Sequence, residues 1–256
     1  MNRIIHTFEQ LRQHGRKAFI GFLMAGDPDI ATSEQRVRAA LENGLDILEL
    51  GVPFSDPTAD GPTIQAAGQR ALASGTTVRL VLDMVMRLRR SFSTPIVLFG
   101  YANPFFSYGY EKLCADAQAA GADGFLIVDL PFEESDEMRP FVEKQDLCLI
   151  PLVAPTTPMD RAGTILQGAK GFVYYIMVKG VTGARDTMAE DVADRIASLR
   201  RQTKLPIAAG FGVSSGAQAR EAAAVADGVV VGSALVQAAH EDRLADLVKE
   251  IARALR

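Results

Sequence analysis

Short apolar runs alternate with longer helical stretches along the chain, and this alternation limits the possible folds more than any other feature. Eight runs rich in β-branched and aromatic residues have the length and composition of buried strands. They span residues 18–23, 46–50, 96–100, 124–128, 148–153, 172–176, 207–209 and 228–231. Helical patterns lie between and after them, at 30–43, 63–74, 78–90, 110–120, 133–144, 159–166, 189–201, 216–225 and 243–255, and a further one precedes the first strand at 4–14.

Eight strands in continuous alternation with helices over 256 residues predict an α/β fold, a single (β/α)8 TIM barrel. The pattern adds an extra N-terminal helix and additional short helices in the βα loops. A doubly wound open sheet is the alternative, but it usually has fewer strands, and no Gly-x-Gly-x-x-Gly motif follows the first strand. No Ser-rich or Pro-rich linker interrupts the pattern, so residues 1–256 form one predicted domain.

Composition excludes several classes of function. Lys and Arg number 27 and Asp and Glu 31, and this formal charge of −4 argues against nucleic acid as the main partner, which requires a basic surface. No apolar run approaches the roughly 20 residues that a bilayer requires. Residues 1–12 alternate polar and apolar side chains, which is not the pattern of a signal peptide. The cytoplasm is therefore the expected compartment.

Residues that bind metals or act as nucleophiles are scarce. Cys114 and Cys148 are too few for a disulfide framework or a zinc site, and we expect two buried thiols. The three histidines, His6, His14 and His240, all lie in helical stretches and none follows an apolar strand. A metal site with His ligands and a Ser-His triad are therefore not expected, and the sequence predicts no metal.

Glu49 is the charged residue whose position is hardest to explain without a function. It lies between Leu48 and Leu50 in the second predicted strand. If both leucines face the surrounding helices, Glu49 points into the barrel near its mouth. Burial of a carboxylate there raises its pKa, so that it can donate and accept protons near neutral pH. The alternative is a structural Glu paired with a Lys or Arg at the strand end.

The loop after the second strand, residues 52–62, is long and rich in Pro, Gly and Asp. Such loops often bind or gate a ligand. Turn formation explains Asp56 best, whereas for Asp60 a functional and a structural role are equally compatible with the local sequence. Asp129, after the fourth strand, either holds a substrate or accepts backbone hydrogen bonds in the turn to Pro131.

Other βα loops predict binding functions as well. The adjacent Phe105 and Phe106 follow the third strand, in a loop where they form either core or an exposed patch for a partner. Residues 177–185 contain two glycines and a Thr, and they suggest a mobile lid. Glycines at 210, 212 and 232, with Ser233, end the seventh and eighth strands, where backbone N–H groups and a short helix N-terminus are suited to a phosphate.

Several segments, in order and spacing, resemble the tryptophan synthase alpha subunit family. The most specific is residues 48–65, Leu-Glu-Leu-Gly-Val-Pro-Phe-Ser-Asp-Pro-Thr-Ala-Asp-Gly-Pro-Thr-Ile-Gln. Others are Ala-Gly-Asp-Pro at 25–28, Tyr-Ala-Asn-Pro at 101–104, Asp-Leu-Pro at 129–131, Gly-Val-Thr-Gly at 180–183, Gly-Phe-Gly-Val at 210–213 and Val-Gly-Ser at 231–233. The resemblance covers nearly the whole chain.

The resemblance implies a carbon–carbon lyase that cleaves indole-3-glycerol phosphate to indole and glyceraldehyde 3-phosphate. It assigns the proton transfers to Glu49 and places Asp60 beside the indole ring. It implies a phosphate cradle of Gly183, Gly212, Gly232 and Ser233. It implies an indole pocket or rim formed by Phe22, Ile64, Phe99, Tyr101, Leu126, Asp129, Tyr174 and Phe211.

The resemblance also implies a partner. Thr182 corresponds to a lid residue that contacts Asp60 when the site closes. Pro53, Asp56, Asn103 and Phe105 correspond to the face that docks a beta subunit. That partner binds pyridoxal phosphate and receives indole through a tunnel in an alpha2beta2 assembly, whereas this subunit binds no organic cofactor. Met177, where a Ser is common, and Lys179 depart from the family pattern and affect lid packing.

Three alternatives remain open at this stage. A class I aldolase would use Lys179 as a Schiff base, because a Lys at a barrel mouth can attack a carbonyl. A non-catalytic subunit would hold a phosphate ligand without turnover, although the presence of both Glu49 and Asp60 argues against it. A stand-alone lyase would release free indole without a beta partner.

Overall fold

The computed structural model describes residues 1–176, 185–210 and 212–256 of the chain. Its strands are β1 (Ala18–Met24), β2 (Ile47–Gly51), β3 (Ile96–Gly100), β4 (Gly124–Ile127), β5 (Cys148–Leu149), β6 (Leu152–Val153), β7 (Val173–Ile176), β8 (Ile207–Gly210) and β9 (Gly228–Val231). They form one parallel sheet in the order β5-β4-β3-β2-β1-β9-β8-β7-β6.

The two edge strands of this order, β5 and β6, are consecutive halves of one barrel strand. The Ile150 N–H donates to the Phe125 carbonyl at 2.8 Å, and the Tyr174 N–H donates to the Pro151 carbonyl at 2.9 Å. The segment therefore bonds to β4 on one side and to β7 on the other. Pro151 has no N–H to give to a ladder, which accounts for the break between the halves. Counted this way, eight strands close the barrel, as the sequence predicts.

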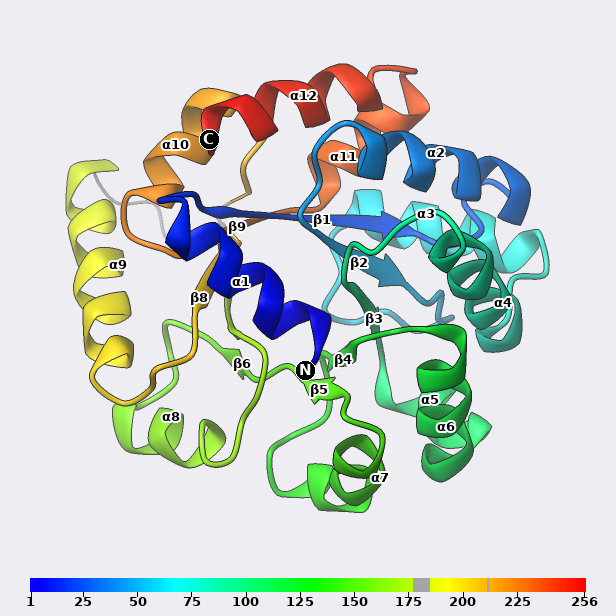
Figure 1. The fold of residues 1–256 in the computed structure, drawn as a ribbon, viewed down its shortest axis with the longest axis horizontal. Coiled ribbons are helices and arrows are strands. Elements are labelled where there is room, and N and C mark those ends of the chain that lie inside the picture. Colours follow the sequence, from blue (N-terminus) through cyan, green and yellow to red (C-terminus); the bar gives the residue numbers. More distant parts are fainter. Residues whose placement is uncertain (177–184, 211) are drawn as a thin grey trace.

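The helices form a ring around the strands (Figure 1). The ring contains α2 (Ile30–Glu42), α4 (Val78–Arg89), α6 (Tyr110–Ala120), α7 (Arg139–Lys144), α8 (Met159–Ile165), α9 (Arg185–Arg200), α10 (Gly216–Ala223) and α12 (Leu244–Ala254). Additional helices in the βα loops are α3 (Pro62–Ala73), α5 (Ala102–Tyr108), η1 (Glu134–Glu137) and α11 (Ser233–His240). Both the extra N-terminal helix and the short loop helices are confirmed.

Helix α1 (Arg3–Gln13) crosses the N-terminal end of the barrel (Figure 1). Its apolar residues Ile4, Phe8 and Leu11 are buried in the cluster that fills the barrel interior. The Phe8 ring lies 5.6 Å from that of Phe172, between centroids. The Asn2 side chain accepts from the Ile4 N–H at 3.0 Å and so begins the helix. This end of the barrel is therefore plugged, and the opposite end is left for chemistry.

Strand alternation separates two apolar layers. Leu48 and Leu50 belong to the cluster between strands and helices, whereas Ile47 belongs to the cluster inside the barrel. All three are 0% exposed. Because successive side chains point to opposite faces of a strand, Glu49 must share the interior side with Ile47. The predicted orientation of β2 is confirmed.

Three local predictions differ from the structure. Residues 102–108, expected as a loop, form α5, because Pro104 lies in its first turn, where a missing N–H costs nothing. The single helix expected at 133–144 is divided into η1 and α7, because Pro140 is likewise confined to a first turn. Helix α9 begins at Arg185 rather than at residue 189.

Candidate active site

Glu49 lies on β2, paired in register with Phe22 of β1 and Val97 of β3. Its side chain is 0% exposed, and among the described residues neither carboxyl oxygen has a hydrogen-bond partner. Burial disfavours the charged form and raises the pKa of Glu49 to about 8. Glu49 is therefore mostly protonated at neutral pH and is able to donate a proton.

Asp60 lies at the end of the loop between β2 and α3. Burial raises its pKa to about 6, and a hydrogen bond from the Tyr101 hydroxyl opposes this rise. At neutral pH Asp60 is therefore mostly ionised. Two carboxyl groups at one mouth thus hold different protonation states, which is the arrangement that separates an acid role from a charge-stabilising role.

Tyr101, which follows β3, holds the Asp60 loop in place. It is 2% exposed, and its hydroxyl accepts the Ala59 N–H at 3.0 Å while bonding to Asp60. Burial, together with the Asp60 charge, raises the pKa of Tyr101 to about 12, so the hydroxyl keeps its proton and donates it to the carboxylate. The Gln65 side chain donates to the Asp60 carbonyl at 2.8 Å and fixes the other side of the loop.

An apolar wall forms beside Glu49. The rings of Phe22 and Phe99 meet edge to face, with centroids 5.0 Å apart. A methyl group built on Gly232 would lie 3.7 Å from both Ile64 and Phe22, so the end of β9 approaches this wall closely. A methyl group on Gly51 would come within 2.6 Å of the Phe22 ring, and only glycine leaves that ring its space. Phe22, Ile64 and Phe99 are thus brought together.

Leu126 and Tyr174 lie deeper. Leu126 is 0% exposed and belongs to the interior cluster, against which Phe99 and Tyr174 pack. The pKa of Tyr174 is raised well above its usual value, first by burial and then by the negative charges of Glu49 and Asp60. The Tyr174 phenol is therefore a neutral group close enough to both carboxyl groups to respond to their charges.

The end of β9 has the local structure of an anion site. Gly232 precedes α11, and the exposed Ser233 is its first residue. The N–H groups of Leu235 and Val236 already bond to the Gly232 carbonyl, at 2.9 and 3.1 Å. The N–H groups of Ser233 and Ala234 are bonded to no backbone carbonyl in the described part of the chain, and they open the positive end of a helix. Gly212, at φ +64°, follows the neighbouring strand β8.

The predicted docking residues divide by burial. Asp56 and Asn103 are exposed, but Pro53 and Phe105 are buried. Phe105 is 0% exposed, with its ring 5.6 Å from that of Phe125, because α5 turns this residue toward the core. Pro53 and Phe105 therefore offer no side-chain surface in this structure, and their assignment to the docking face stays a prediction. The exposed neighbour is Phe106, at 62%.

Asp129 has a structural task. Its carboxylate accepts the Ala102 N–H at 2.7 Å and so caps the start of α5. One of its two predicted roles was to accept backbone hydrogen bonds in the turn to Pro131. It does accept a backbone hydrogen bond, but the donor belongs to α5. Thr182, Gly183, Phe211, Met177 and Lys179 lie outside the described residues.

A cluster around Asp27 was not predicted. Its carboxylate, 6% exposed, accepts from Arg70 Nε at 2.7 Å and Nη2 at 3.0 Å, and His240 Nε2 lies 2.8 Å away. It joins α3, which follows the Asp60 loop, to α11, which begins at Ser233. The three residues are 43 and 213 positions apart, so no local pattern links them. Asp27 itself, in the Ala-Gly-Asp-Pro segment at the end of the first strand, was the available signal.

Within the described residues, no group of three or more His, Cys, Asp or Glu is arranged to hold a metal ion. Cys114 and Cys148 are buried free thiols, as expected. No helix of this part of the chain has the length and apolar character needed to span a bilayer. The fold and the site together define the class as a (β/α)8-barrel enzyme whose apolar mouth holds one protonated and one ionised carboxyl group beside a helix N-terminus.

Comparison with known proteins identifies the family within this class. The family model described as "Tryptophan synthase alpha chain" matches residues 8–255. The chain therefore belongs to the tryptophan synthase alpha chain family.

Individual relatives agree. The tryptophan synthase alpha chain of Desulfosudis oleivorans is 53% identical, over 91% of this chain and 88% of the relative. That of Geobacter sulfurreducens is 48% identical, over 98% and 96%. Among solved structures, tryptophan synthase from Mycobacterium tuberculosis in its aminoacrylate-bound form superposes with a TM-score of 0.92 at 35% identity, covering 100% of both chains. A structure from Aquifex aeolicus superposes at 0.93 with 41% identity, also over 100% of both.

Proposed function

We propose that Glu49 and Asp60 together catalyse the reaction of this chain, which is a carbon–carbon lyase of tryptophan biosynthesis. The reaction that its family implies is the retro-aldol cleavage of indole-3-glycerol phosphate to indole and glyceraldehyde 3-phosphate. The observation that supports the proposal most is the pair of raised pKa values, about 8 for Glu49 and about 6 for Asp60. At neutral pH one group has a proton to give and the other has a negative charge.

The proton transfers balance around Glu49. The protonated carboxyl group donates to C3 of the indole ring, which becomes a cation. The bond between C3 and the glycerol carbon then breaks, and its electron pair returns to the ring. The hydroxyl on that glycerol carbon loses its proton to the Glu49 carboxylate and becomes the aldehyde. Glu49 ends protonated again, ready for another cycle, and no metal or organic cofactor enters these steps.

Asp60 acts by charge. Its carboxylate accepts the indole N–H and faces the positive charge that develops on the ring. A preorganised charge of this kind is worth a few kcal/mol, roughly 10²–10³ in rate. The hydrogen bond from Tyr101 favours the ionised form of Asp60 and orients it, so Tyr101 is a positioning residue in addition to its expected place at the rim of the pocket.

The remaining groups bind the substrate. The N–H groups at Ser233 and Ala234, with Gly232 and Gly212, are suited to the phosphate, and Gly183 is expected to join them. Phe22, Ile64 and Phe99 form an apolar wall for the ring, with Leu126 and Tyr174 below it. The expected parts of Phe211 in this pocket and of Thr182 in a lid over Asp60 belong to the same proposal.

The partner in this proposal is a beta subunit that binds pyridoxal phosphate and receives indole in an alpha2beta2 assembly. This chain needs no organic cofactor of its own. The exposed Asp56, in the loop after β2, and the exposed Asn103 and Phe106, on α5, lie on the mouth side of the barrel and form the proposed docking surface. The expected compartment is the cytoplasm, which suits an enzyme of amino-acid biosynthesis.

Replacement of Glu49 by Gln tests the proposal. Gln fills the same space but donates no proton of comparable acidity, so the release of indole should fall by about 10²–10⁴ while substrate binding is nearly retained. Turnover and equilibrium binding are measured on the same preparation. Turnover above about one hundredth of that of the parent chain would show that Glu49 is not the general acid.

A further inference from the structure

A groove lies at the end of the barrel opposite the mouth. It has a volume of about 780 Å³. Helix α1 forms one side, and the segments that enter β7, β8, β1 and β9 form the other. The size is typical of pockets for small organic molecules. None of the residues proposed for the reaction lines it.

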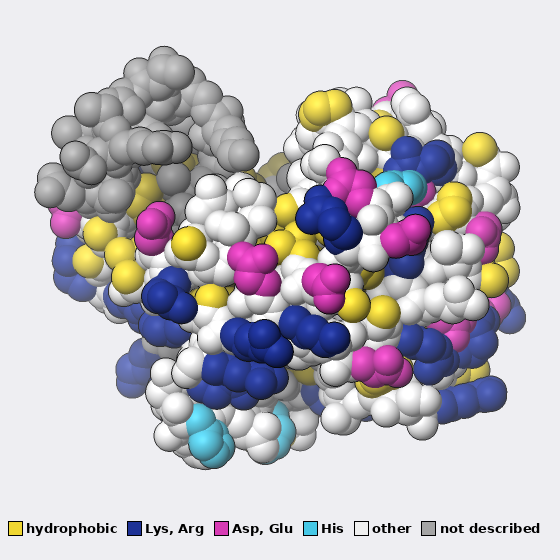
Figure 2. Space-filling model, turned by 90° about the horizontal axis from the view of Figure 1, so that it is seen from above, with side chains coloured by type: hydrophobic (Ala, Val, Ile, Leu, Met, Phe, Trp, Pro, Cys, Tyr) yellow, Lys and Arg dark blue, Asp and Glu magenta, His cyan; other side chains and the backbone are white. Residues whose placement is uncertain are grey.

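The charge of this groove is opposite to that of the whole chain. Six cationic side chains line it, namely Arg12, Arg16, Lys17, Lys170, Arg200 and Lys204, against two acidic ones, Glu9 and Asp227. The formal charge of the lining is therefore 6 − 2 = +4, in a chain of net charge −4. In Figure 2 the side of the molecule that bears α1 lies at the lower edge, and Lys and Arg side chains gather in this lower half.

Three of these cations are held by the protein itself. Lys17 donates to the Ala226 carbonyl at 2.7 Å, and Arg200 pairs with Asp227 at 2.9 Å. Arg16 makes a looser contact of 3.4 Å with Asp46, while its buried Nε has no hydrogen-bond partner in the described part of the chain.

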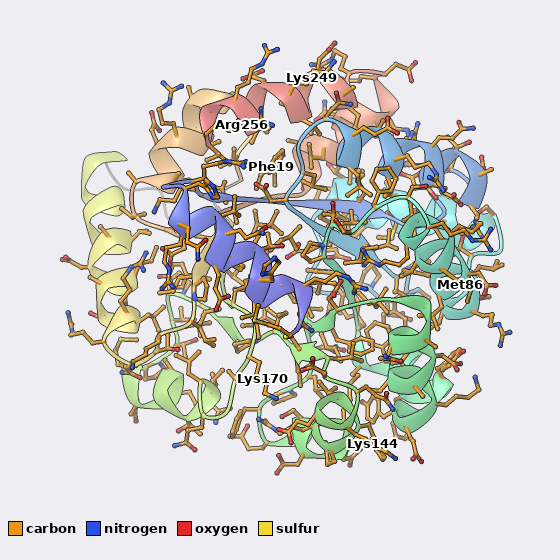
Figure 3. All side chains as sticks on the ribbon, in the orientation of Figure 1. Phe19, Met86, Lys144, Lys170, Lys249 and Arg256 are labelled. Carbon is orange, nitrogen blue, oxygen red and sulfur yellow. The ribbon has the colours of Figure 1, made fainter. Side chains whose placement is uncertain are left out.

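The other three are available to a ligand. Across the described residues, Arg12, Lys170 and Lys204 form no ion pair of 4.0 Å or less with a carboxylate, and all three are exposed. Arg12 lies in the last turn of α1, where a helix favours a cation. Lys170 (labelled in Figure 3) and Lys204 lie in loops, where no such effect explains them.

The floor of the groove is apolar. Phe8 and Leu11 of α1 line it, together with Leu205 and Pro206 from the segment before β8. Phe8 and Leu11 are themselves buried, but Leu205 and Pro206 are half-buried, and a purely inorganic anion would leave these two in contact with water. A ring system would cover them and gain from burial, while its charged groups reach the cationic rim.

We propose that this groove binds a small organic anion that combines a flat ring body with at least two negative charges, of the class of nucleoside diphosphates. The ring lies on the apolar floor, and the diphosphate meets Arg12, Lys170 and Lys204. The site is separate from the mouth, so its occupant and the substrate bind at the same time.

Calorimetric titration of the full chain with ADP tests this inference. The titration is run first without and then with saturating glyceraldehyde 3-phosphate, which occupies the proposed phosphate cradle. ADP should bind with a stoichiometry of one, whereas adenosine and inorganic pyrophosphate, which each lack one half of the ligand, should each bind at least about tenfold more weakly. Raising the ionic strength should weaken ADP binding.

Charge variants locate the site. Arg12→Glu and Lys204→Glu should each weaken ADP binding by about tenfold, since each replaces an attraction at a few ångströms by a repulsion. Lys249→Glu, an exposed residue of α12 labelled in Figure 3, makes the same change of net charge elsewhere and should alter binding less than about twofold. Glu9→Gln removes a negative charge from the groove and should tighten binding, a gain that misfolding cannot produce.

Three results would overturn the inference. One is the absence of ADP binding at millimolar concentration and low salt. Another is binding that Lys249→Glu weakens as much as the groove variants do. The last is binding that disappears when glyceraldehyde 3-phosphate is added, because ADP would then lie in the mouth. None of these outcomes bears on the roles of Glu49 and Asp60.

Discussion

At the scale of single residues, the site depends on a buried acid that the fold accommodates only in its neutral form. Glu49 is fully buried and its pKa is about 8, against about 4.5 in an unfolded chain. An acid whose pKa is raised on folding destabilises the folded chain least at low pH, where it is protonated in both the folded and the unfolded state. The folded chain therefore loses stability as the pH rises from about 4.5 through about 8.

This cost predicts a stability difference with a defined sign. Glu49→Gln stays neutral at every pH, so its free energy of unfolding should exceed that of the parent chain at pH 9 and approach it at pH 5. Urea unfolding at the two pH values measures the difference. An equal difference at both pH values would mean that Glu49 does not titrate in this range.

Tyr101 allows a prediction about Asp60. Tyr101→Phe removes the hydroxyl that bonds to the carboxylate and lowers its pKa. The pKa of Asp60 should then rise above about 6, and the acidic limb of the pH profile of kcat/KM should shift to higher pH. Tyr108→Phe, on α5, is the matched control, because its hydroxyl bonds instead to Asp116. A profile that does not move in Tyr101→Phe would remove Tyr101 from its positioning role.

At the scale of elements, the Asp27 cluster joins the two helices that follow the parts of the site. Asp27→Asn keeps the shape but loses the charge that Arg70 and His240 face, and it should cost about 1–2 kcal/mol of stability. The cost stays moderate because both partners are partly exposed, at 39% and 34%, and regain water. Thermal or urea unfolding measures it.

The control for this prediction is Asp136→Asn. Asp136 also faces an arginine, Arg139, but at 3.5 Å and with its side chain 80% exposed. An exposed pair of this kind contributes little, so the loss should stay below about 0.5 kcal/mol. Equal losses in the two variants would show that the Asp27 cluster has no special importance.

The elements also show how far the sequence predicts the site. Alternation within β2 predicted Glu49 inside the barrel on the condition that Leu48 and Leu50 face helices, and the structure meets that condition. The contact between Tyr101 and the Asp60 loop joins segments 42 residues apart, and no periodicity reveals it. Phe105 and Phe106 were indistinguishable as neighbours in a loop, and only the helix α5 turns one into the core and leaves the other exposed.

At the scale of the whole molecule, the barrel was predictable because strands and helices alternate along the chain without a break. Their apolar residues recur with different periods, so the sequence distinguishes one kind of element from the other. The spacing of the apolar residues could not predict how the strands close into a barrel. The fifth barrel strand is split at Ile150 and Pro151, and closure depends on its bonds to β4 and β7. The closed barrel has at one end an apolar mouth that contains two carboxyl groups, and at the other end a cationic groove.

The exposed part of α5 gives a prediction for assembly. Turnover should rise strongly when a beta subunit is added, and Phe106→Asp should abolish this rise while leaving the turnover of the isolated chain unchanged. Met86→Asp, an equally drastic change at a residue of α4 that is 46% exposed, should preserve the rise. Equal turnover with and without the beta subunit would favour a stand-alone lyase.

The most direct test of the account measures the two carboxyl groups themselves. Carbon-13 NMR titration of the side-chain carboxyl groups, with Glu49→Gln and Asp60→Asn used to assign the signals, gives both pKa values in the same protein. We expect a value near 8 for Glu49 and near 6 for Asp60, so that one is protonated and the other ionised at neutral pH. A Glu49 that titrates near its ordinary value of 4.5 would contradict the account, because no proton would then be available at the mouth for the indole ring.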